Sequence, residues 1–552
     1  MGKVSVAVIV SLWVISVSIL VNRIVPEPYM DEIFHIPQAQ QYCIGNFRSW
    51  DPMITTPPGL WGRVHPWFTP WGGPKGPALL NVASALVELV FWANGRKAMK
   101  RLYYLSLVHV ASLFPSIFIV QAASSFSEVC TTAILRSVNG VLAVLCSIIV
   151  YEIITLLRPT LSERKATIFA VVLALYPLHW FFTFLYYTDV ASLTAVLAMY
   201  LACLKKSYWC SAVLGALAVV IRQTNIVWML FVACTGVINI TLVHTRDNVE
   251  ENNIYKAIRK TNRATSNDNV TSNSNLRRRK FSNALGTDKQ STPSASFFSA
   301  NHSSGLLDEV EVILLALWHR KWELLVSFSP FLMVFVSFLA FVHWNGSVVL
   351  GAKEAHTVSP HFAQIMYFGL VSALAVAPLH CSIGHIVDLF QSFWKRRPIS
   401  FFQVLIAVIA GFFSVHFYSI AHPYLIADNR HYPFYLWRKV INAHWSMKYL
   451  LVPLYVYSWF SVLSTLGKVQ RKIWILAFFL ATAAVLVPAP LIEFRYYTIP
   501  LYFMILHSHI NDYQSWLLMG LIYLALNIFT MTIFLFRPFH WDQEPGIQRF
   551  IW

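Results

Sequence analysis

The chain has 552 residues, of which 57% are hydrophobic, 15% are aromatic and only 12% are charged. A soluble domain carries about twice that share of charged residues, so the composition excludes this class and predicts an integral membrane protein. The net charge of +17 would suit a nucleic-acid partner, but Lys and Arg cluster beside apolar runs. Such clusters are typical of the cytoplasmic ends of membrane spans. We therefore expect the lipid bilayer, and no nucleic acid, as a partner.

Apolar stretches of about 20 residues, long enough to cross ~30 Å of hydrocarbon as helices, recur along the whole chain. Since lipid offers the backbone no hydrogen-bond partners, these spans should be α-helices. The first runs from Val4 to Val21 and, lacking a small-residue cleavage site before Pro26, is expected to be an uncleaved anchor with a cytosolic N-terminus. Further spans are predicted at 134–157, 167–183, 190–204, 208–221, 226–243, 323–343, 362–379, 400–420, 449–467, 473–492, 496–509 and 514–536. The predicted fold class is an all-α polytopic membrane protein with about 12–14 transmembrane helices.

A hydrophilic stretch, residues 244–317, separates two helical halves, residues 1–243 and 318–552. The stretch is rich in Asn, Ser, Thr, Arg and Lys and poor in aromatic residues, so it cannot bury enough apolar surface to order itself. We expect a disordered cytosolic loop.

The seven cysteines show no CxxC motif or other metal-binding spacing, and most of them lie in apolar runs. Their pattern supports neither a disulfide framework nor a zinc site. We therefore predict no metal site.

Ionisable residues gather at the predicted non-cytoplasmic ends of the spans. Asp31, Glu32 and His35 closely follow the first span. Aromatic residues accompany these groups, and any single one of them is best explained as part of an interfacial belt. Carboxylates and arginines are costly in a membrane unless they are paired or face a wet cavity, so they indicate a functional site.

Carboxylates, arginines and aromatic rings at one membrane face suit glycosyl transfer from a lipid phosphate. A carboxylate can take the proton of a hydroxyl nucleophile, cationic side chains can hold a phosphate leaving group, and aromatic rings suit a sugar. A proton-coupled transporter would also need Asp, Glu, His and Arg near its spans. It is less favoured, because transporters place their sites near the midplane.

Several of these loops lie in longer blocks that resemble a known family. The blocks are YMDEIFHIPQAQ, WDPMITTPPGL, FLYYTD, IRQTNIVW, NGSVVLGAKEAHTVSPHFAQ, YLIADNRHYPFYLWRKV, EFRYYTIP and IQRFIW. These blocks, and the order in which they occur along the chain, resemble those of the dolichyl-phosphate-glucose-dependent α-1,2-glucosyltransferases of the endoplasmic reticulum. The resemblance implies a multi-pass GT-C membrane bundle with a luminal active site. Such an enzyme adds the third and last glucose to the dolichol-pyrophosphate-linked oligosaccharide for N-glycosylation, with dolichyl phosphate glucose as donor and no cofactor or obligatory metal.

The resemblance also implies inversion at the anomeric carbon and an acidic general base in the first luminal loop, which is either Asp31 or Glu32. Arg430 and Arg495 are candidates for the donor phosphate, with Lys353 as a substitute, because guanidinium groups bind phosphate through two donors. The other predicted substrate-binding residues are His35, Asp189, Arg222, His356, Asp428, His431 and Glu493. Arg222 is also explained by neutralisation of Asp189 or Glu493, and a structural hydrogen bond explains either His356 or His431 equally well.

Residues 61–102 depart from the family pattern, which stops at Leu60 and resumes at Tyr103. Three explanations compete: a lineage-specific luminal insertion, an added membrane-associated helix near 78–93, and a retained intron. We favour the retained intron, because removal of 61–102 restores the family pattern.

One alternative belongs to another class of function. A non-catalytic membrane regulator would bind a channel or another membrane partner, with residues 244–317 as the contact. Such a protein would tolerate Asp31→Asn, Glu32→Gln and Arg495→Ala.

Overall fold

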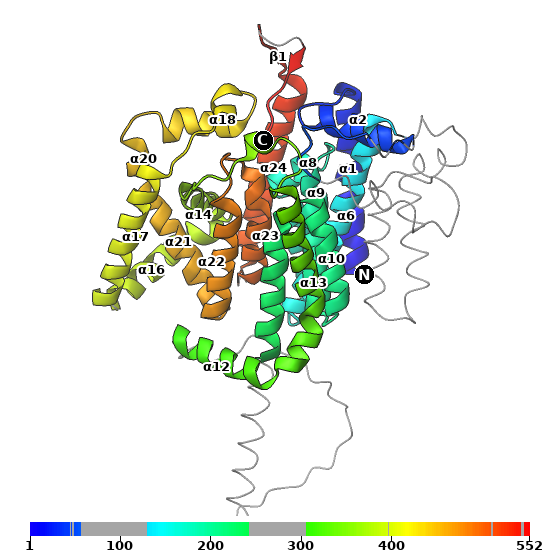
Figure 1. The fold of residues 1–552 in the computed structure, drawn as a ribbon. Coiled ribbons are helices and arrows are strands. Elements are labelled where there is room, and N and C mark those ends of the chain that lie inside the picture. The colour runs from blue at the N-terminus through cyan, green and yellow to red at the C-terminus, as the bar shows by residue number, and fades with distance from the viewer. Residues whose placement is uncertain are drawn as a thin grey trace, which may run out of the picture.

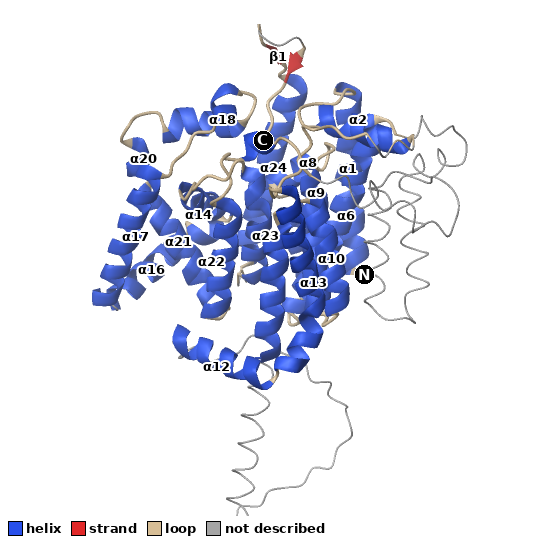
Figure 2. Ribbon diagram, in the orientation of Figure 1, coloured by secondary structure: helices blue, strands red, loops and turns tan. Residues whose placement is uncertain are grey.

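The computed structural model describes residues 1–56, 130–241 and 305–552, apart from positions 45, 47, 48, 396, 509, 511 and 543–545 and the side chains of 355 and 356. Regular structure in these residues is helical except for one antiparallel pair, β1 (Phe539–His540) and β2 (Ile547–Gln548) (Figures 1 and 2). The predicted all-α class is confirmed. The predicted insertion at 61–102 and the side chain of His356 lie outside the described residues.

The first half of the chain forms a tight group of helices around α6, which packs against α1, α7 and α9, while α9 packs against α10. The labelled helices of this half are α1 (Gly2–Ile24), α2 (Glu32–Cys43), α6 (Thr132–Leu157), α7 (Glu163–Ala174), α8 (Pro177–Phe182), α9 (Thr188–Leu204) and α10 (Tyr208–Ile221).

The second half continues the bundle, with α14 packed against α21, and α21 against α17 and α22. Its longer helices are α12 (Leu306–His319), α13 (Lys321–Asn345), α14 (Ala363–Ala375), α16 (Ile383–Lys395), α17 (Arg397–Phe417), α21 (Val452–Gly467), α22 (Lys472–Leu486), α23 (Thr498–His507) and α24 (Tyr513–Phe536). Its short helices are η2 (Lys353–His356), α15 (Ala377–His380), α18 (Pro423–Ala427), α19 (Tyr432–Leu436), η3 (Trp437–Ile441), α20 (Met447–Leu450) and η4 (Phe494–Tyr497).

Six described helices are long and apolar enough to cross a membrane: Gly2–Ile24, Thr132–Leu157, Lys321–Asn345, Arg397–Phe417, Met447–Gly467 and Tyr513–Phe536. The shorter apolar helices are Thr188–Leu204, Tyr208–Ile221, Asn225–Thr241, Ala363–Ala375 and Lys472–Leu486. The predicted span 167–183 is divided, since α7 ends at Ala174 and α8 begins at Pro177. Proline has no backbone N–H and cannot continue the helix that precedes it.

Helix α12 begins inside the stretch 244–317 that the sequence predicted to be disordered. Ile313 and Ala316 are buried, α12 packs against α13 and α22, and Glu309 accepts a hydrogen bond from the backbone N–H of Ile473. The average composition of the long stretch concealed this local apolar periodicity. The expected loop therefore gives way to a helix at Leu306.

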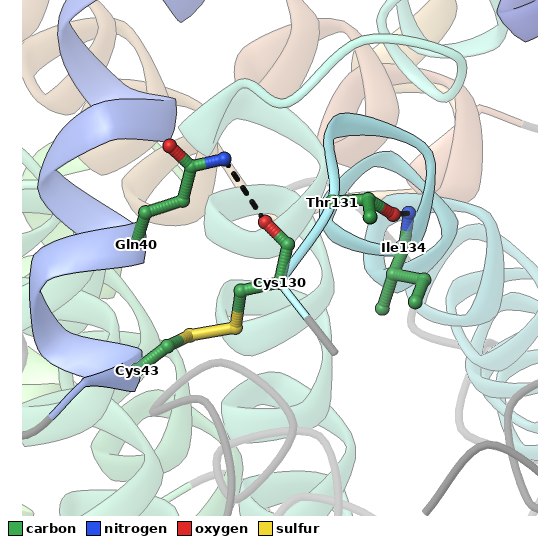
Figure 3. The surroundings of a disulfide bond; sticks show 5 residues. All are labelled: Gln40, Cys43, Cys130, Thr131 and Ile134. Atoms are coloured by element: carbon green, nitrogen blue, oxygen red, sulfur yellow. Dashed lines mark hydrogen bonds between the residues drawn. A yellow bond between two sulfur atoms is a disulfide. The ribbon is translucent and has the colours of Figure 1, made fainter. Parts of the chain in front are cut away.

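Cys43, at the end of α2, and Cys130, two residues before α6, form a disulfide (Figure 3). Gln40 Nε2 reinforces this junction by donating to the Cys130 carbonyl oxygen at 3.0 Å. The prediction from cysteine spacing was wrong here, because the partners are 87 residues apart and form no local motif. The disulfide fastens the C-terminal end of α2 to the beginning of α6.

The ends of the bundle differ (Figure 1). One end carries α2, α18, β1 and the C-terminus, and α12 lies at the other. We call the end with α2 the loop face. Most of the ionisable candidates belong to segments that meet there.

Candidate active site on the loop face

Asp31 and Glu32, the first two acidic residues of the site, lie at a tight turn. Glu32 N–H donates to the Tyr29 carbonyl oxygen at 3.2 Å, and Met30 between them has a φ of 57°. Asp31 N–H donates to the hydroxyl of Tyr187 at 3.2 Å. The turn thus sets Asp31 directly before α2, with 42% of its side chain exposed.

Glu32, the neighbouring acid, is fully buried. Its Oε1 accepts hydrogen bonds from Arg136 Nε at 2.9 Å and Tyr186 N–H at 2.5 Å. Its Oε2 accepts from Arg136 Nη2 at 2.6 Å and Tyr29 N–H at 3.1 Å. Four donors therefore occupy the carboxylate, and no face of it is open to a substrate hydroxyl.

Asp31 instead belongs to a group of five ionisable residues, which we call the central cluster: Asp31, Asp189, Arg222, Glu493 and Arg495. Arg495 Nη1 lies 3.0 Å from Asp31 Oδ2 and 3.8 Å from Asp189 Oδ2, and its Nε and Nη2 pair with Glu493. Arg222 Nη1 lies 2.9 Å from Asp189 Oδ1. Three carboxylates and two guanidinium groups give a formal charge of −1.

The cluster keeps two of its members charged. Burial lowers the pKa of Arg495, but the charges of Glu493, Asp31 and Asp189 outweigh it and raise the pKa well above its ordinary value. Burial likewise raises the pKa of Glu493, but the charge and the hydrogen bonds of Arg495, with a smaller contribution from His431, together outweigh it and leave the pKa lowered. Both groups are therefore ions at neutral pH.

His35 lies one turn along α2 from Asp31 and faces the same charges. Burial lowers its pKa, and Arg495 lowers it further, whereas Asp31, Asp189 and Asp51 raise it. The net shift is downward, so the imidazole is neutral at neutral pH.

Arg430 lies in a second group of contacts. Its Nε and Nη2 pair with both oxygens of Asp428 at 2.9 and 2.8 Å, its Nη1 donates to Gln548 at 2.8 Å, and its guanidinium covers the Trp541 ring. The side chain of His431 lies 3.7 Å from Asp428. Protein groups thus engage all three guanidinium nitrogens of Arg430, as Asp31 and Glu493 engage all three of Arg495.

The chain segment 546–552 joins this second group to the rest of the site. Ile551 N–H donates to the Arg430 carbonyl oxygen and its own carbonyl accepts from Tyr432 N–H. The Tyr29 hydroxyl donates to the Arg549 carbonyl oxygen at 2.6 Å. The segment thus connects the 428–432 loop with the turn that carries Asp31.

Lys353 lies on an exposed segment at the edge of the site, and its Nζ donates to the Asn345 carbonyl oxygen. The same segment pairs with residues 52–55, since Leu350 N–H donates to the Thr55 carbonyl. Gln223 Nε2 donates to that carbonyl too, at 2.9 Å. Lys353 therefore sits on a layer of loops tied to the residue beside Arg222.

Sequence reasoning missed two residues that shape this site, Arg136 and Tyr187. An arginine inside a predicted apolar span is costly, and this signal could have drawn attention to Arg136. For Tyr187 no comparable signal exists, because tyrosines are common at membrane interfaces.

Comparisons with known proteins show the family of the chain. Residues 25–71 and 92–506 match the DIE2/ALG10 family, and the chain belongs to it. Of the predicted insertion at 61–102, only residues 72–91 fall outside the match, whereas 61–71 and 92–102 lie within it. A relative from Arabidopsis thaliana is 54% identical over 100% of both chains, and one from Homo sapiens is 31% identical over 96% of this chain and 94% of its own. Both are named Dol-P-Glc:Glc(2)Man(9)GlcNAc(2)-PP-Dol alpha-1,2-glucosyltransferase. No solved structure matches the chain.

Proposed function

We propose that this chain transfers glucose from dolichyl phosphate glucose, in α-1,2 linkage, to the diglucosylated dolichol-pyrophosphate-linked oligosaccharide. Asp31 is the general base. The observation that carries the assignment is the contrast between Asp31, half-exposed in the central cluster, and the buried Glu32. Family membership and the names of the relatives support the reaction.

In the proposed step Asp31 takes the proton from the 2-hydroxyl of the terminal glucose on the acceptor. The oxygen attacks C1 of the donor glucose from the face opposite the phosphate. The new C–O bond forms as the C1–phosphate oxygen bond breaks, so the anomeric centre inverts and dolichyl phosphate leaves. Arg495, with Arg222 paired to the same Asp189, offsets the charge of the leaving phosphate. No cofactor enters this balance.

We place the loop face in the lumen of the endoplasmic reticulum. The Cys43–Cys130 disulfide supports this orientation, because disulfides persist in oxidising compartments and are rare on the cytosolic side of membranes. Lipid-linked donor and acceptor would reach the site from the bilayer, with their sugars among the loops.

The test is glucose transfer by purified protein supplied with both lipid-linked substrates. We expect wild type to add one glucose and Asp31→Asn to lose about 10²–10⁴-fold in kcat, the usual contribution of a general base. The exposed carboxylate Asp388 on α16 provides a matched control, and Asp388→Asn should keep full activity. Donor binding measured in parallel should persist in Asp31→Asn. An active Asp31→Asn would refute the base assignment, and an inactive but folded wild type would refute the reaction.

A further inference from the structure

Helix α2, which begins directly after Asp31, is fastened to α6 at both of its ends. Glu32 and Arg136 form a buried two-point ion pair at the first end. The Cys43–Cys130 disulfide closes the other end (Figure 3). Rotation and sliding of α2 relative to α6 are both restricted by this pair of junctions.

Arg136 also holds the chain that leads into the turn. Its Nη1 donates to Asn22 Oδ1 at 3.1 Å and to the Val25 carbonyl oxygen at 2.6 Å, and its Nη2 donates to the Glu27 carbonyl oxygen at 3.0 Å. Its contacts with the backbone before the turn and with Glu32 after it bracket Asp31 from both sides.

The junction between Glu32 and Arg136 is also connected to a second loop, which contains Tyr186 and Tyr187. Glu32 accepts from the backbone N–H of Tyr186, and the hydroxyl of the next residue, Tyr187, accepts from the backbone N–H of Asp31. The Asp31 side chain itself, by contrast, is half-exposed and paired only with Arg495 among the described residues. Its placement therefore depends on the backbone on either side of it.

We propose that Arg136 and Glu32 are positioning residues, which hold the Asp31 carboxylate at the distance from the acceptor hydroxyl that proton transfer needs. The inference rests on the proposed function, because it takes Asp31 as the base. A displacement of about 1 Å in a reacting group can cost about 10²-fold in rate, so the positioning residues should act on kcat without touching substrate.

The test compares Arg136→Lys and Arg136→Met with a matched substitution on the same helix. Arg158 directly follows Leu157, the last residue of α6, at the end of the helix away from Arg136. Its side chain donates hydrogen bonds to the carbonyl oxygens of Leu506 and Ser508. Arg158→Lys removes a comparable arginine far from Asp31. For each variant, Tm, donor Kd, KM for both substrates and kcat would be measured on the full chain.

We expect Arg136→Met to lower kcat about 100-fold and Arg136→Lys about 10-fold, with KM and donor Kd within about twofold of wild type. Arg158→Lys should lower Tm as much as Arg136→Lys and leave kcat unchanged. The proposal is overturned if kcat per folded molecule stays at the wild-type value in both Arg136 variants, or if the loss appears in KM instead. If Asp31→Asn is active in the same assay, it is the base assignment that fails.

The disulfide gives a second variant that leaves Arg136 intact. Replacing Cys43 and Cys130 together by serine should lower kcat less than Arg136→Met does, since Glu32 still fixes the near end of α2. The proposal is overturned if the double serine variant loses all activity while Arg136→Met remains fully active. Glu32→Gln cannot identify the base, because its new NH₂ group would face two of the donors that Glu32 now satisfies.

Discussion

Met30 adopts a left-handed backbone conformation directly before Asp31, with a φ of 57°. This conformation costs a residue with a Cβ about 1–2 kcal/mol, whereas glycine adopts it freely. Met30→Gly removes that cost but adds chain freedom and loses side-chain contacts. We therefore expect its free energy of unfolding to change by less than about 2 kcal/mol and kcat to fall about 10-fold, because Asp31 is held less firmly.

Lys206 provides the matched control for Met30. It has a φ of 60°, is exposed, and follows Lys205, which pairs with Glu152 at the end of the bundle near the N-terminus. Lys206→Gly should change stability by a similar small amount and leave kcat at the wild-type value. Equal losses of kcat in both variants would contradict the special role of the turn at Met30.

His35 gives the protein a pH-dependent stability on the acid side of neutrality. Its pKa in the folded protein is below the ordinary 6.5, chiefly through burial, so between these values the unfolded chain binds more protons. The stability contributed by His35 is complete above pH 6.5 and is lost as the pH falls through the folded pKa. His35→Gln should therefore lose less Tm than wild type between about pH 7.5 and about pH 5.5. Thermal unfolding in detergent measures both slopes, and equal slopes would contradict the shift.

The sequence identified all five members of the central cluster but could not separate Asp31 from Glu32. The two acids are adjacent and alike in chemistry, and the difference comes from Arg136, 104 residues away. Likewise, Arg430 and Arg495 stand in similar aromatic surroundings, yet Asp428, Gln548 and Trp541 engage only the former. Residue type and position relative to the spans were readable from sequence, whereas pairing over long separations was not.

At the scale of elements, Gly351 allows two loop segments to lie against one another. A Cβ at this position would overlap the carbonyl oxygens of Pro52 and Ile54. On either side of Gly351, Leu350 and Ala352 donate hydrogen bonds to the 52–55 segment at 3.1 and 3.0 Å. Gly351→Ala should therefore force the segments apart and cost about 1–3 kcal/mol, as overpacking usually does. Activity should fall as well, because the 52–55 segment contacts the residue next to Arg222.

Gly384 on α16 is the control for Gly351, since a Cβ there meets no atom within 4 Å. Gly384→Ala should keep activity and, by reducing the freedom of the unfolded chain, raise stability by about 0.5–1 kcal/mol. Thermal unfolding and glucose transfer would be measured on both variants. A Gly351→Ala protein as stable and active as Gly384→Ala would show that the segments do not pack as described.

Helix positions were more predictable than helix ends. Long apolar runs such as Thr132–Leu157 were recognised from hydropathy alone, because lipid leaves a helix as the main option for them. The division at Pro177 and the start of α12 at Leu306 depend on local features that a window of about 20 residues averages out.

At the scale of the whole molecule, the site is assembled from segments distributed over nearly the full chain. The turn at Asp31, the start of α9, the end of α10 and the segment before α23 supply the central cluster. Asp31 and Asp189 find their cations on other segments, whereas Glu493 pairs with Arg495 on its own segment. The fold therefore pairs charges that would otherwise be costly at the edge of a membrane.

The two ends of a bundle that crosses a membrane face different compartments, and the cysteines can test which end is luminal. Cys381 is exposed and lies two residues before α16, beside Asp512 and Ser515 at the start of α24, the end of that helix away from β1 and the loop face. In sealed microsomes, whose outer surface is the cytosolic one, a membrane-impermeant maleimide should label Cys381 without detergent. Cys43 and Cys130 should react only after permeabilisation and reduction, because the disulfide joins them. Cys381→Ser should abolish the detergent-independent signal, whereas labelling of Cys381 only in permeabilised vesicles would reverse the proposed orientation.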